Sequence, residues 1–261
     1  MKKTPVLFIG HGSPMNIVLA NEFTNSLVQL GQSLPEPKAI LVVSAHWLTK
    51  GTFITSGEKP ETIYDFYGFP QELYDVPYPC PGAAEQIKNM ASLCSSASIG
   101  FDDQRGIDHA AWSVLKHMYP KSNVPVMEMS LDYTKTPAEH YELAKKLAPL
   151  REQGILIIGS GNIVHNLRVI DWNIDAKAFD WAVSFDHIVK KCLVEGDHKP
   201  LIEYEKIGKD ALLSIPTNEH YLPMLYAAAL QEQDEEIHFC YEGFQNGSIS
   251  MRCFSYGKVE R

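Results

Sequence analysis

The stretch ILIIGSGNIVHNL (Ile155–Leu167) decides the fold, because it joins an apolar run to a corner of small residues and then to a histidine. Two further runs have the same form, VLFIG (Val6–Gly10) and AILVVSA (Ala39–Ala45). All three are rich in aliphatic and β-branched residues and stop at small residues, which is typical of strands buried on both faces of a parallel sheet. VPVMEMS (Val124–Ser130) is a weaker fourth candidate. We therefore expect a mostly parallel central sheet.

Helical patterns alternate with these strands. They cover Ala20–Leu34, Gly82–Cys94, Ala110–Met118, Pro137–Leu150, Ala176–Glu195 and a segment that begins near Glu219. Strands that alternate with helices predict βαβ units, with helices on both faces of the sheet. Near the C-terminus, IHFCYEGFQ and SISMRCFSY flank Asn246–Gly247, which predicts an antiparallel hairpin with a type I′ turn at one sheet edge. Without repeats or a linker, we expect one α/β domain over residues 1–261.

The composition limits the possible partners. The formal net charge of −9 and the isoelectric point of about 5.6 argue against nucleic acid and against an anionic membrane surface, both of which require clustered Lys and Arg. Five scattered cysteines without a CxxC pair argue against a disulfide framework and favour a reducing compartment. No run approaches the roughly 20 apolar residues of a membrane span. We expect a cytoplasmic protein, and the sequence leaves its oligomeric state open.

Three of the ten histidines lie at the ends of the expected strands. His11 directly follows VLFIG, His46 directly follows AILVVSA, and His165 lies shortly after ILIIG. Ligands bind α/β sheets in the crevice beyond the carboxyl ends of the strands, and neutral imidazole is a common ligand of transition metals. Taken singly, His11 fits a turn and His46 fits a packed core. Their matching positions together predict a metal site.

A fourth and a fifth histidine stand near helix starts. In PTNEHYLPML, Thr217 or Asn218 resembles an N-cap, and Pro223 fits only the first turn of a helix. These signals place Glu219 and His220 at the N-terminus of a helix.

In GIDHAAW, His109 follows Asp108, which either orients the imidazole or caps the helix. The other five histidines are expected to be surface or packing residues: His117, His140, His187, His198 and His238. GSGN has neither the P-loop nor the GxGxxG spacing, so the small-residue corner is a weak candidate for binding phosphate. We expect it instead to let the chain turn tightly at the crevice. The serines lack the context of a nucleophile elbow.

Several long stretches together resemble the 4,5-DOPA extradiol dioxygenase family, a group of class III extradiol ring-cleavage enzymes related to the protocatechuate 4,5-dioxygenase beta subunit. They are GHGSPMN, VVSAHW, YDFYGFP, YPCPG, GIDHAAW, ILIIGSGNIVHNLR, PTNEHYLPMLY and SMRCF, and they run almost from end to end of the chain. The resemblance implies one mononuclear metal held by His11, His46 and His220. His165 is implied as a further ligand in a zinc form or as an acid/base group, and His109 as a residue that contacts bound oxygen or substrate.

The resemblance also implies a pocket and a substrate. The run from Tyr64 to Tyr78 corresponds to the wall of an aromatic pocket, where a catechol such as L-DOPA would be cleaved by O2 to a muconic semialdehyde. Zn(II) suits an all-histidine site, whereas Fe(II) is expected for dioxygenase activity. Arg105, Arg168 and Arg252 are candidates for binding the carboxylate of an amino-acid tail.

Some positions depart from the family pattern. Glu219 stands beside His220 and could replace it as a ligand, since related enzymes use a carboxylate there. Ala110 replaces a glycine, and Cys80 and Cys253 replace small residues, so we expect these three side chains to crowd the pocket.

Three other functions stay open. One is a zinc hydrolase, in which His165 or Glu219 activates a metal-bound water. Another is a tetrapyrrole metal chelatase, which shares only GHGS after the first strand. In the third, the histidines are structural and the aromatic run binds a partner.

Overall fold

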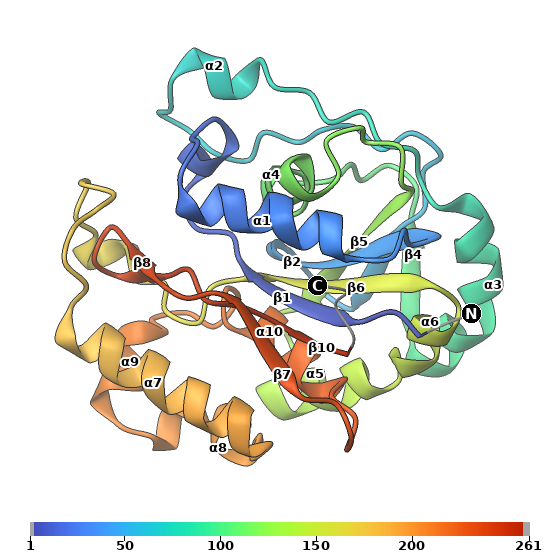
Figure 1. Ribbon diagram of the computed structural model, residues 1–261. Coiled ribbons are helices and arrows are strands. Elements are labelled where there is room, and N and C mark those ends of the chain that lie inside the picture. Colours follow the sequence, from blue (N-terminus) through green and yellow to red (C-terminus); the bar gives the residue numbers. More distant parts are fainter. Residues whose placement is uncertain (1–2, 258–261) are drawn as a thin grey trace.

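An eight-stranded sheet forms the centre of the protein, for which a computed structural model describes residues 3–257. The strand order is β4-β3-β5-β2-β6-β1-β10-β7 (Figure 1). The strands are β1 (Val6–Gly10), β2 (Ala39–Thr49), β3 (Thr52–Thr55), β4 (Ile99–Asp102), β5 (Val126–Asp132), β6 (Ile155–Gly161), β7 (Ile237–Tyr241) and β10 (Cys253–Tyr256). This architecture confirms the predicted α/β fold with a mostly parallel sheet.

The four central strands, β5, β2, β6 and β1, are mutually parallel. They are the four strands that the apolar runs predicted, and each is buried along most of its length. The edges differ, because β10 joins β1 in the antiparallel sense and β3 joins β5 in the antiparallel sense. The sequence did not predict β3 and β4, whose short segments TFIT and IGFD carry too few apolar residues for a periodic signal.

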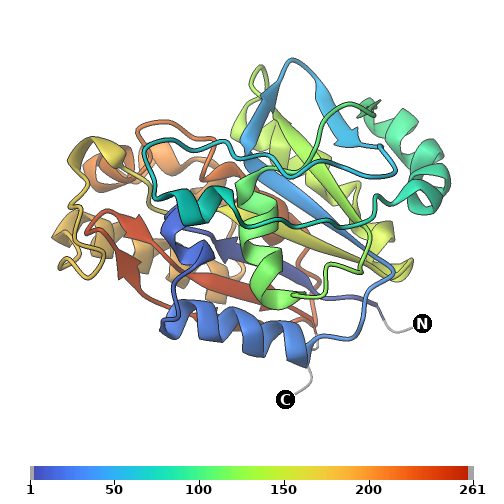
Figure 2. The same ribbon diagram turned by 90° about the horizontal axis from the view of Figure 1, so that it is seen from above.

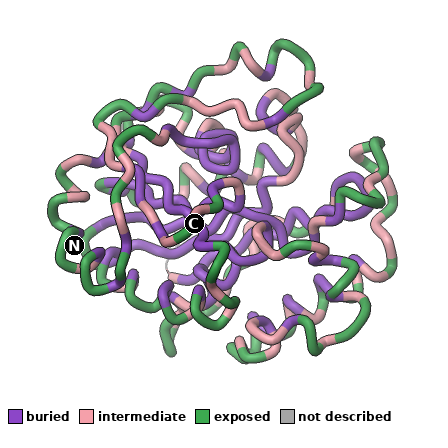
Figure 3. Tube along the Cα trace, turned by 180° about the vertical axis from the view of Figure 1, so that it is seen from behind, coloured by how far each residue is buried: buried purple, intermediate pink, exposed green. Residues whose placement is uncertain are grey.

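Helices cover both faces of the sheet, as predicted. Along β1, Leu7 and Ile9 pack on the side of α1 (Glu22–Ser33) and α4 (His109–Met118), whereas Phe8 packs on the other side. That second face is covered by α3 (Ala84–Ala97), α5 (Pro137–Lys145), α7 (Asp180–Glu195) and α10 (Leu222–Ala229). Figure 3 shows the central strands buried and the outer helices exposed along their outward sides.

Shorter elements complete the chain: η1 (Pro14–Ile17), α2 (Gln71–Tyr74), α6 (Ala148–Glu152), η2 (Leu167–Val169), α8 (Lys199–Ile202), η3 (Tyr204–Lys206) and α9 (Lys209–Ser214). The predicted helix Pro137–Leu150 is in fact α5 and α6, separated at Lys146 and Leu147. Pro149 explains the break, because it has no N–H to continue the hydrogen bonding of α5 and is accepted only in the first turn of α6.

The C-terminal hairpin is present but interrupted. β7 pairs with β10 at the sheet edge, while β8 (Phe244–Gln245) and β9 (Ile249–Ser250) form a separate two-stranded sheet. Asn246 and Gly247 have positive φ values of 54° and 70°, as in a type I′ turn, but the pairing of Gln245 with Ile249 leaves three residues between the strands and not the two that were predicted. The ladder of β7 and β10 is itself irregular, because its register shifts between Cys253 and Phe254. Among residues 3–257, no helix is long and apolar enough to cross a membrane.

Candidate metal centre

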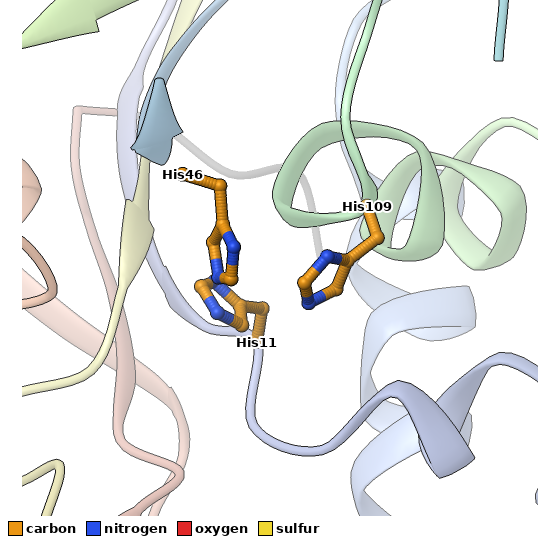
Figure 4. Close-up of side chains that lie close together, drawn as sticks. All are labelled: His11, His46 and His109. Carbon is orange, nitrogen blue, oxygen red and sulfur yellow. The ribbon is translucent and has the colours of Figure 1, made fainter. Parts of the chain in front are cut away.

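Five imidazoles gather where the carboxyl ends of β1, β2 and β6 meet. His11 directly follows β1, His46 lies near the end of β2 and His165 lies shortly after β6. His109 is the first residue of α4, and His220 lies in the turn that precedes α10. The ring centre of His46 is 5.2 Å from that of His11, 4.1 Å from that of His109 and 4.9 Å from that of His220. Figure 4 shows His11, His46 and His109 pointing toward one another.

His46 lies in an irregular part of β2, whereas the sequence predicted that it would directly follow the strand. The strand continues to Thr49, and its pairing with β5 shifts register between Val43 and Leu48. An irregular ladder of this kind redirects side chains. The shift explains how a residue inside a central strand faces the crevice.

The glycines of the small-residue corner belong to β6 and form no tight turn, contrary to the sequence interpretation. A Cβ atom on Gly159 would lie 2.1 Å from the carbonyl oxygen of Pro223, and one on Gly161 would lie 2.1 Å from that of His220. The next residue, Asn162, donates its backbone N–H to the same His220 oxygen at 2.8 Å. The glycines therefore admit the first turn of α10 and the turn before it against the sheet, which fixes the backbone of His220.

Ser160 determines which nitrogen of His11 carries a proton. Its hydroxyl donates to the backbone carbonyl of Ala110 at 2.6 Å, which uses its only proton. Nδ1 of His11, 3.1 Å from the same oxygen, must therefore be the donor in that contact. This leaves a lone pair on Nε2 of His11, the form that binds a metal.

Asp65 orients two further imidazoles. Its Oδ1 accepts from the backbone N–H and from Nδ1 of His109, both at 2.9 Å, and its Oδ2 lies 3.0 Å from Nδ1 of His46. Because a carboxylate can only accept, both Nδ1 atoms are stabilised as N–H and both Nε2 atoms keep a lone pair. Asp65 was not predicted from the sequence, where its only signal is an acidic side chain inside the aromatic run YDFYGFP.

Glu219 lies beside Nδ1 of His220 at 3.2 Å and also accepts the hydroxyl of Thr217 at 2.8 Å. Nε2 of His220 lies 3.1 Å from Nε2 of His46. His165 stacks on His220, with ring centres 3.6 Å apart and planes inclined by only 10°.

Burial holds most of these imidazoles neutral. Burial, and then the neighbouring histidines, lower the pKa of His11, His165 and His220 well below the ordinary value of 6.5. Burial likewise lowers the pKa of His109. For His46, burial acts in the same direction, but the nearby carboxylates, Asp65 foremost, outweigh it and raise the pKa. Neutral imidazole is the form that coordinates metals.

The donor set fits a divalent metal ion. Two lone-pair nitrogens at 3.1 Å repel unless a cation lies between them, and tetrahedral Zn–N bonds place ligand nitrogens about 3.3 Å apart. Ligand atoms lie within 4.8 Å of one another in two groups: His11, His46 and His109, and His165, Glu219 and His220. Either group, or residues from both groups together, could therefore coordinate one metal ion.

A cavity of about 400 Å³ opens onto the five imidazoles, a size normal for small-molecule sites. From the aromatic run, only Phe66, Tyr67 and Phe69 line it together with Asp65. The other aromatic residues of that run pack behind the wall, where the segment that carries α2 lies next to α4 (Figure 2).

The expectation that three unusual side chains crowd the pocket is wrong. Ala110, Cys80 and Cys253 are buried and do not line the cavity. Their side chains face the core, so they do not occupy the space above the imidazoles.

Asp108 caps α4 and does not orient His109. It accepts the N–H of Ala110 at 3.1 Å and the hydroxyl of Ser44 at 2.9 Å, and it pairs with Arg105 at 3.0 Å.

The two other arginines proposed for a substrate carboxylate also lie outside the cavity. Arg252 is buried in ion pairs with Asp186 and Glu242. Arg168 lines a neighbouring groove of about 770 Å³.

The remaining five histidines lie outside the cavity lining. His140 is the most buried of them and packs in the core. Its Nδ1 contacts the hydroxyl of Tyr226 at 2.9 Å and its Nε2 the carbonyl of Asp132 at 3.2 Å. Burial lowers the pKa of His140 to about 4.

An α/β sheet with a histidine-rich pocket at its carboxyl edge defines a class of enzyme that binds small molecules beside a metal. Residues 6–250 match the family model described as the catalytic LigB subunit of aromatic ring-opening dioxygenase. The chain belongs to this family, and it is an extradiol dioxygenase. Membership implies one mononuclear metal, a catechol substrate and O2.

Similar proteins cover the chain almost completely. The 4,5-DOPA dioxygenase extradiol of Escherichia coli (strain K12) is 44% identical over 98% of this chain and 95% of its own length. The protein of the same name from Beta vulgaris is 31% identical over 95% of each chain. The crystal structure of an uncharacterized protein from Escherichia coli K12 superposes with a TM-score of 0.85 at 40% identity, covering 98% of this chain and 100% of that one.

Proposed function

We propose that this protein opens the ring of a catechol such as L-DOPA by 4,5-cleavage with O2. Both oxygen atoms enter the product, a muconic semialdehyde, so no external reductant is needed. The observation that carries the proposal is the convergence of five imidazoles on one cavity, with the Nδ1 atoms of four of them held by Ser160, Asp65 and Glu219. The names of the relatives from Escherichia coli and Beta vulgaris support the choice of L-DOPA.

We assign the metal to His11, His46 and His220. The 3.1 Å spacing of the His46 and His220 nitrogens supports His220 over His109 as the third ligand. The contact of Glu219 with Nδ1 of His220 makes Glu219 a partner of that histidine, so we do not assign it as a replacement ligand. Fe(II), the ion we propose, supplies Lewis acidity and redox chemistry when bound, whereas Zn(II) supplies Lewis acidity alone.

We assign His165 as the acid/base group. His165 stacks face to face on His220, with ring planes inclined by only 10°, so His220 would hold the ion and His165 would stay free of it. His165 is therefore free to accept a proton from a catechol hydroxyl and to return it to the opened product. His109 faces the same cavity from α4 and is assigned to contact oxygen or substrate.

Oxygen uptake after anaerobic reconstitution with Fe(II) tests the proposal. We expect one O2 consumed per catechol, a yellow ring-opened product and no uptake by the zinc-loaded protein. Absence of uptake with every catechol tried would refute the dioxygenase function. The zinc sample also tests the hydrolase alternative, which ester turnover with zinc, together with absent oxygen uptake with iron, would favour.

We further propose that residues 1–261 act as one catalytic domain in the cytoplasm. Strand β1 pairs with β10, so segments that are far apart in the sequence belong to one sheet. Within residues 3–257 the five cysteines are free thiols, as in proteins of reducing compartments.

A further inference from the structure

His46, which we assign as a metal ligand, lies in a stretch of β2 that the sheet itself does not hold. The ladder with β5 is regular up to Val43 and resumes at Leu48, so residues 44–47 of β2 lie opposite the single residue Ser130. On the other side of β2, the pairing with β6 ends at Ser44. Such irregularities leave backbone groups without partners in the ladder, and those groups need other partners. We call residues 44–47 the irregular stretch.

The side chain of Ser44 ties the irregular stretch to the start of α4. Its oxygen accepts the backbone N–H of His46 at 3.0 Å. Its only proton is donated to the carboxylate of Asp108, whose two oxygens both lie 2.9 Å away. Ser44 and Asp108 are fully buried, so water does not compete for these contacts. The backbone of His46 is thus linked through one hydroxyl to a buried carboxylate.

Asp108 is itself held by three partners. Its carboxylate accepts the N–H of Ala110 at 3.1 Å and pairs with Arg105 at 3.0 Å. Its backbone N–H donates to the carboxylate of Glu128, a buried residue of β5, at 2.7 Å. Strand β5 therefore reaches the irregular stretch through Asp108, at the place where its own ladder with β2 is interrupted.

Arg105 also contacts the far side of the irregular stretch. Its guanidinium carbon lies 5.3 Å from the ring centre of Trp47, within the range of a cation–π contact. His46 thus stands between two residues that are anchored to the same group, because Ser44 contacts Asp108 directly and Trp47 contacts its partner Arg105. Two separate contacts therefore fix the backbone on either side of this imidazole.

We propose that Ser44 and Asp108 are positioning residues of the metal centre, which hold the irregular stretch so that the imidazole of His46 faces the cavity. Neither residue lines the cavity, so both act through His46 and not on substrate or oxygen. Their task differs from that of Asp65, which contacts the ring nitrogen of His46, whereas Ser44 holds its backbone. The proposal rests on the proposed function, because it takes His46 as a metal ligand.

Hydrogen exchange in the metal-free protein tests the contact itself. In Ser44→Ala the backbone N–H of His46 loses its acceptor and should exchange roughly tenfold faster than in wild type, measured by NMR. Ser255→Ala is the matched control, since it removes another fully buried serine hydroxyl, on β10, which β6 and β1 separate from β2. We expect exchange at His46 to be unchanged in this control.

Metal binding tests the consequence for the site. Under chelator competition, Ser44→Ala should bind Zn(II) roughly tenfold more weakly than wild type, because a displaced ligand no longer fits the geometry of the others. The visible absorption bands of the Co(II)-loaded protein report ligand geometry and should shift in Ser44→Ala. Ser255→Ala should keep the wild-type affinity and spectrum, even if its thermal stability falls as much.

A second variant covers the case in which Ser44→Ala does not fold. Arg105→Gln removes the cation shared by Asp108 and Trp47 from a side chain that is 24% exposed. We expect the same shift of the Co(II) bands and a weakening of Zn(II) binding of roughly threefold, because Ser44 still holds the N–H of His46.

Three results would overturn the proposal. One is equal exchange of the His46 N–H in Ser44→Ala and wild type. Another is a Ser44→Ala protein, or in its absence an Arg105→Gln protein, with wild-type Zn(II) affinity and Co(II) spectrum. The third is full metal retention by His46→Ala, which would remove the ligand on which the proposal rests. Oxygen uptake enters none of these measurements, so its absence in the iron-loaded wild type would refute the proposed dioxygenase function and leave the positioning of His46 standing.

Discussion

The substitution Asp65→Asn tests how one carboxylate organises the metal centre. The amide oxygen should keep the side facing His109, because two N–H groups donate to that oxygen. The amide NH2 group then faces Nδ1 of His46, which must become an acceptor. The His46 proton moves to Nε2, 3.1 Å from Nε2 of His220, and removes the lone pair that a metal needs.

The expected loss follows from one charge-assisted contact. Such a hydrogen bond contributes about 1.5–3 kcal/mol, and changes to groups that orient metal ligands lower metal affinity about 10–100-fold. The measurement is a competition titration of Zn(II) and Fe(II) against a chelator, for wild type and Asp65→Asn. Thermal unfolding of the metal-free proteins checks that the fold is kept.

Asp75→Asn is the matched control, because Asp75 is an exposed carboxylate ten residues along the same segment that accepts a hydrogen bond from Gln71 and none from a histidine among residues 3–257. We expect its metal affinity to equal that of the wild type. An Asp65→Asn protein that folds normally and binds both metals with wild-type affinity would refute the role given to Asp65.

Three further predictions concern stability and the approach of the chain to the sheet. For His140, whose pKa is about 4 in the folded protein against 6.5 when unfolded, the unfolded chain binds more protons between these values. The stabilisation is thus complete above pH 6.5, and about 3 kcal/mol of it is lost as the pH falls to 4. In parallel urea titrations, His140→Gln should show a weaker dependence of the unfolding free energy on pH than wild type. An equal dependence in both proteins would contradict this prediction. Gly161→Ala should push the His220 backbone away and lower Zn(II) affinity at least about tenfold in chelator competition, and unchanged affinity would show that the contact is not needed. Arg252→Met should cost about 3–5 kcal/mol in urea unfolding by leaving Asp186 buried and unpaired, whereas a loss below about 1 kcal/mol would mean that the pair is solvated.

The strand-end histidines could be predicted from sequence because parallel strands present their carboxyl ends at one edge. That rule alone brings His11, His46 and His165 together. It could not supply Asp65, which reaches His109 across 44 positions of sequence and carries no periodic signal. Contacts of this kind depend on how a loop packs over the sheet.

The role of the glycines in the small-residue corner could not be predicted from the sequence either. Gly159 and Gly161 suggested a turn, because glycine is most familiar where the backbone adopts positive φ. Their actual role is to make room for the start of α10 and the turn before it, and a single sequence does not reveal which neighbour comes close. The short edge strands β3 and β4 were missed for a related reason, since pairing partners decide their structure.

Metal retention by five alanine variants tests most directly the central claim that three imidazoles hold the metal while His165 moves protons. Each purified variant is titrated with Zn(II) under chelator competition, alongside wild type. We predict that His11→Ala, His46→Ala and His220→Ala lose tight binding, whereas His165→Ala and His109→Ala retain it within about tenfold. Loss of the metal from His165→Ala, or its retention by His220→Ala, would contradict the assignment.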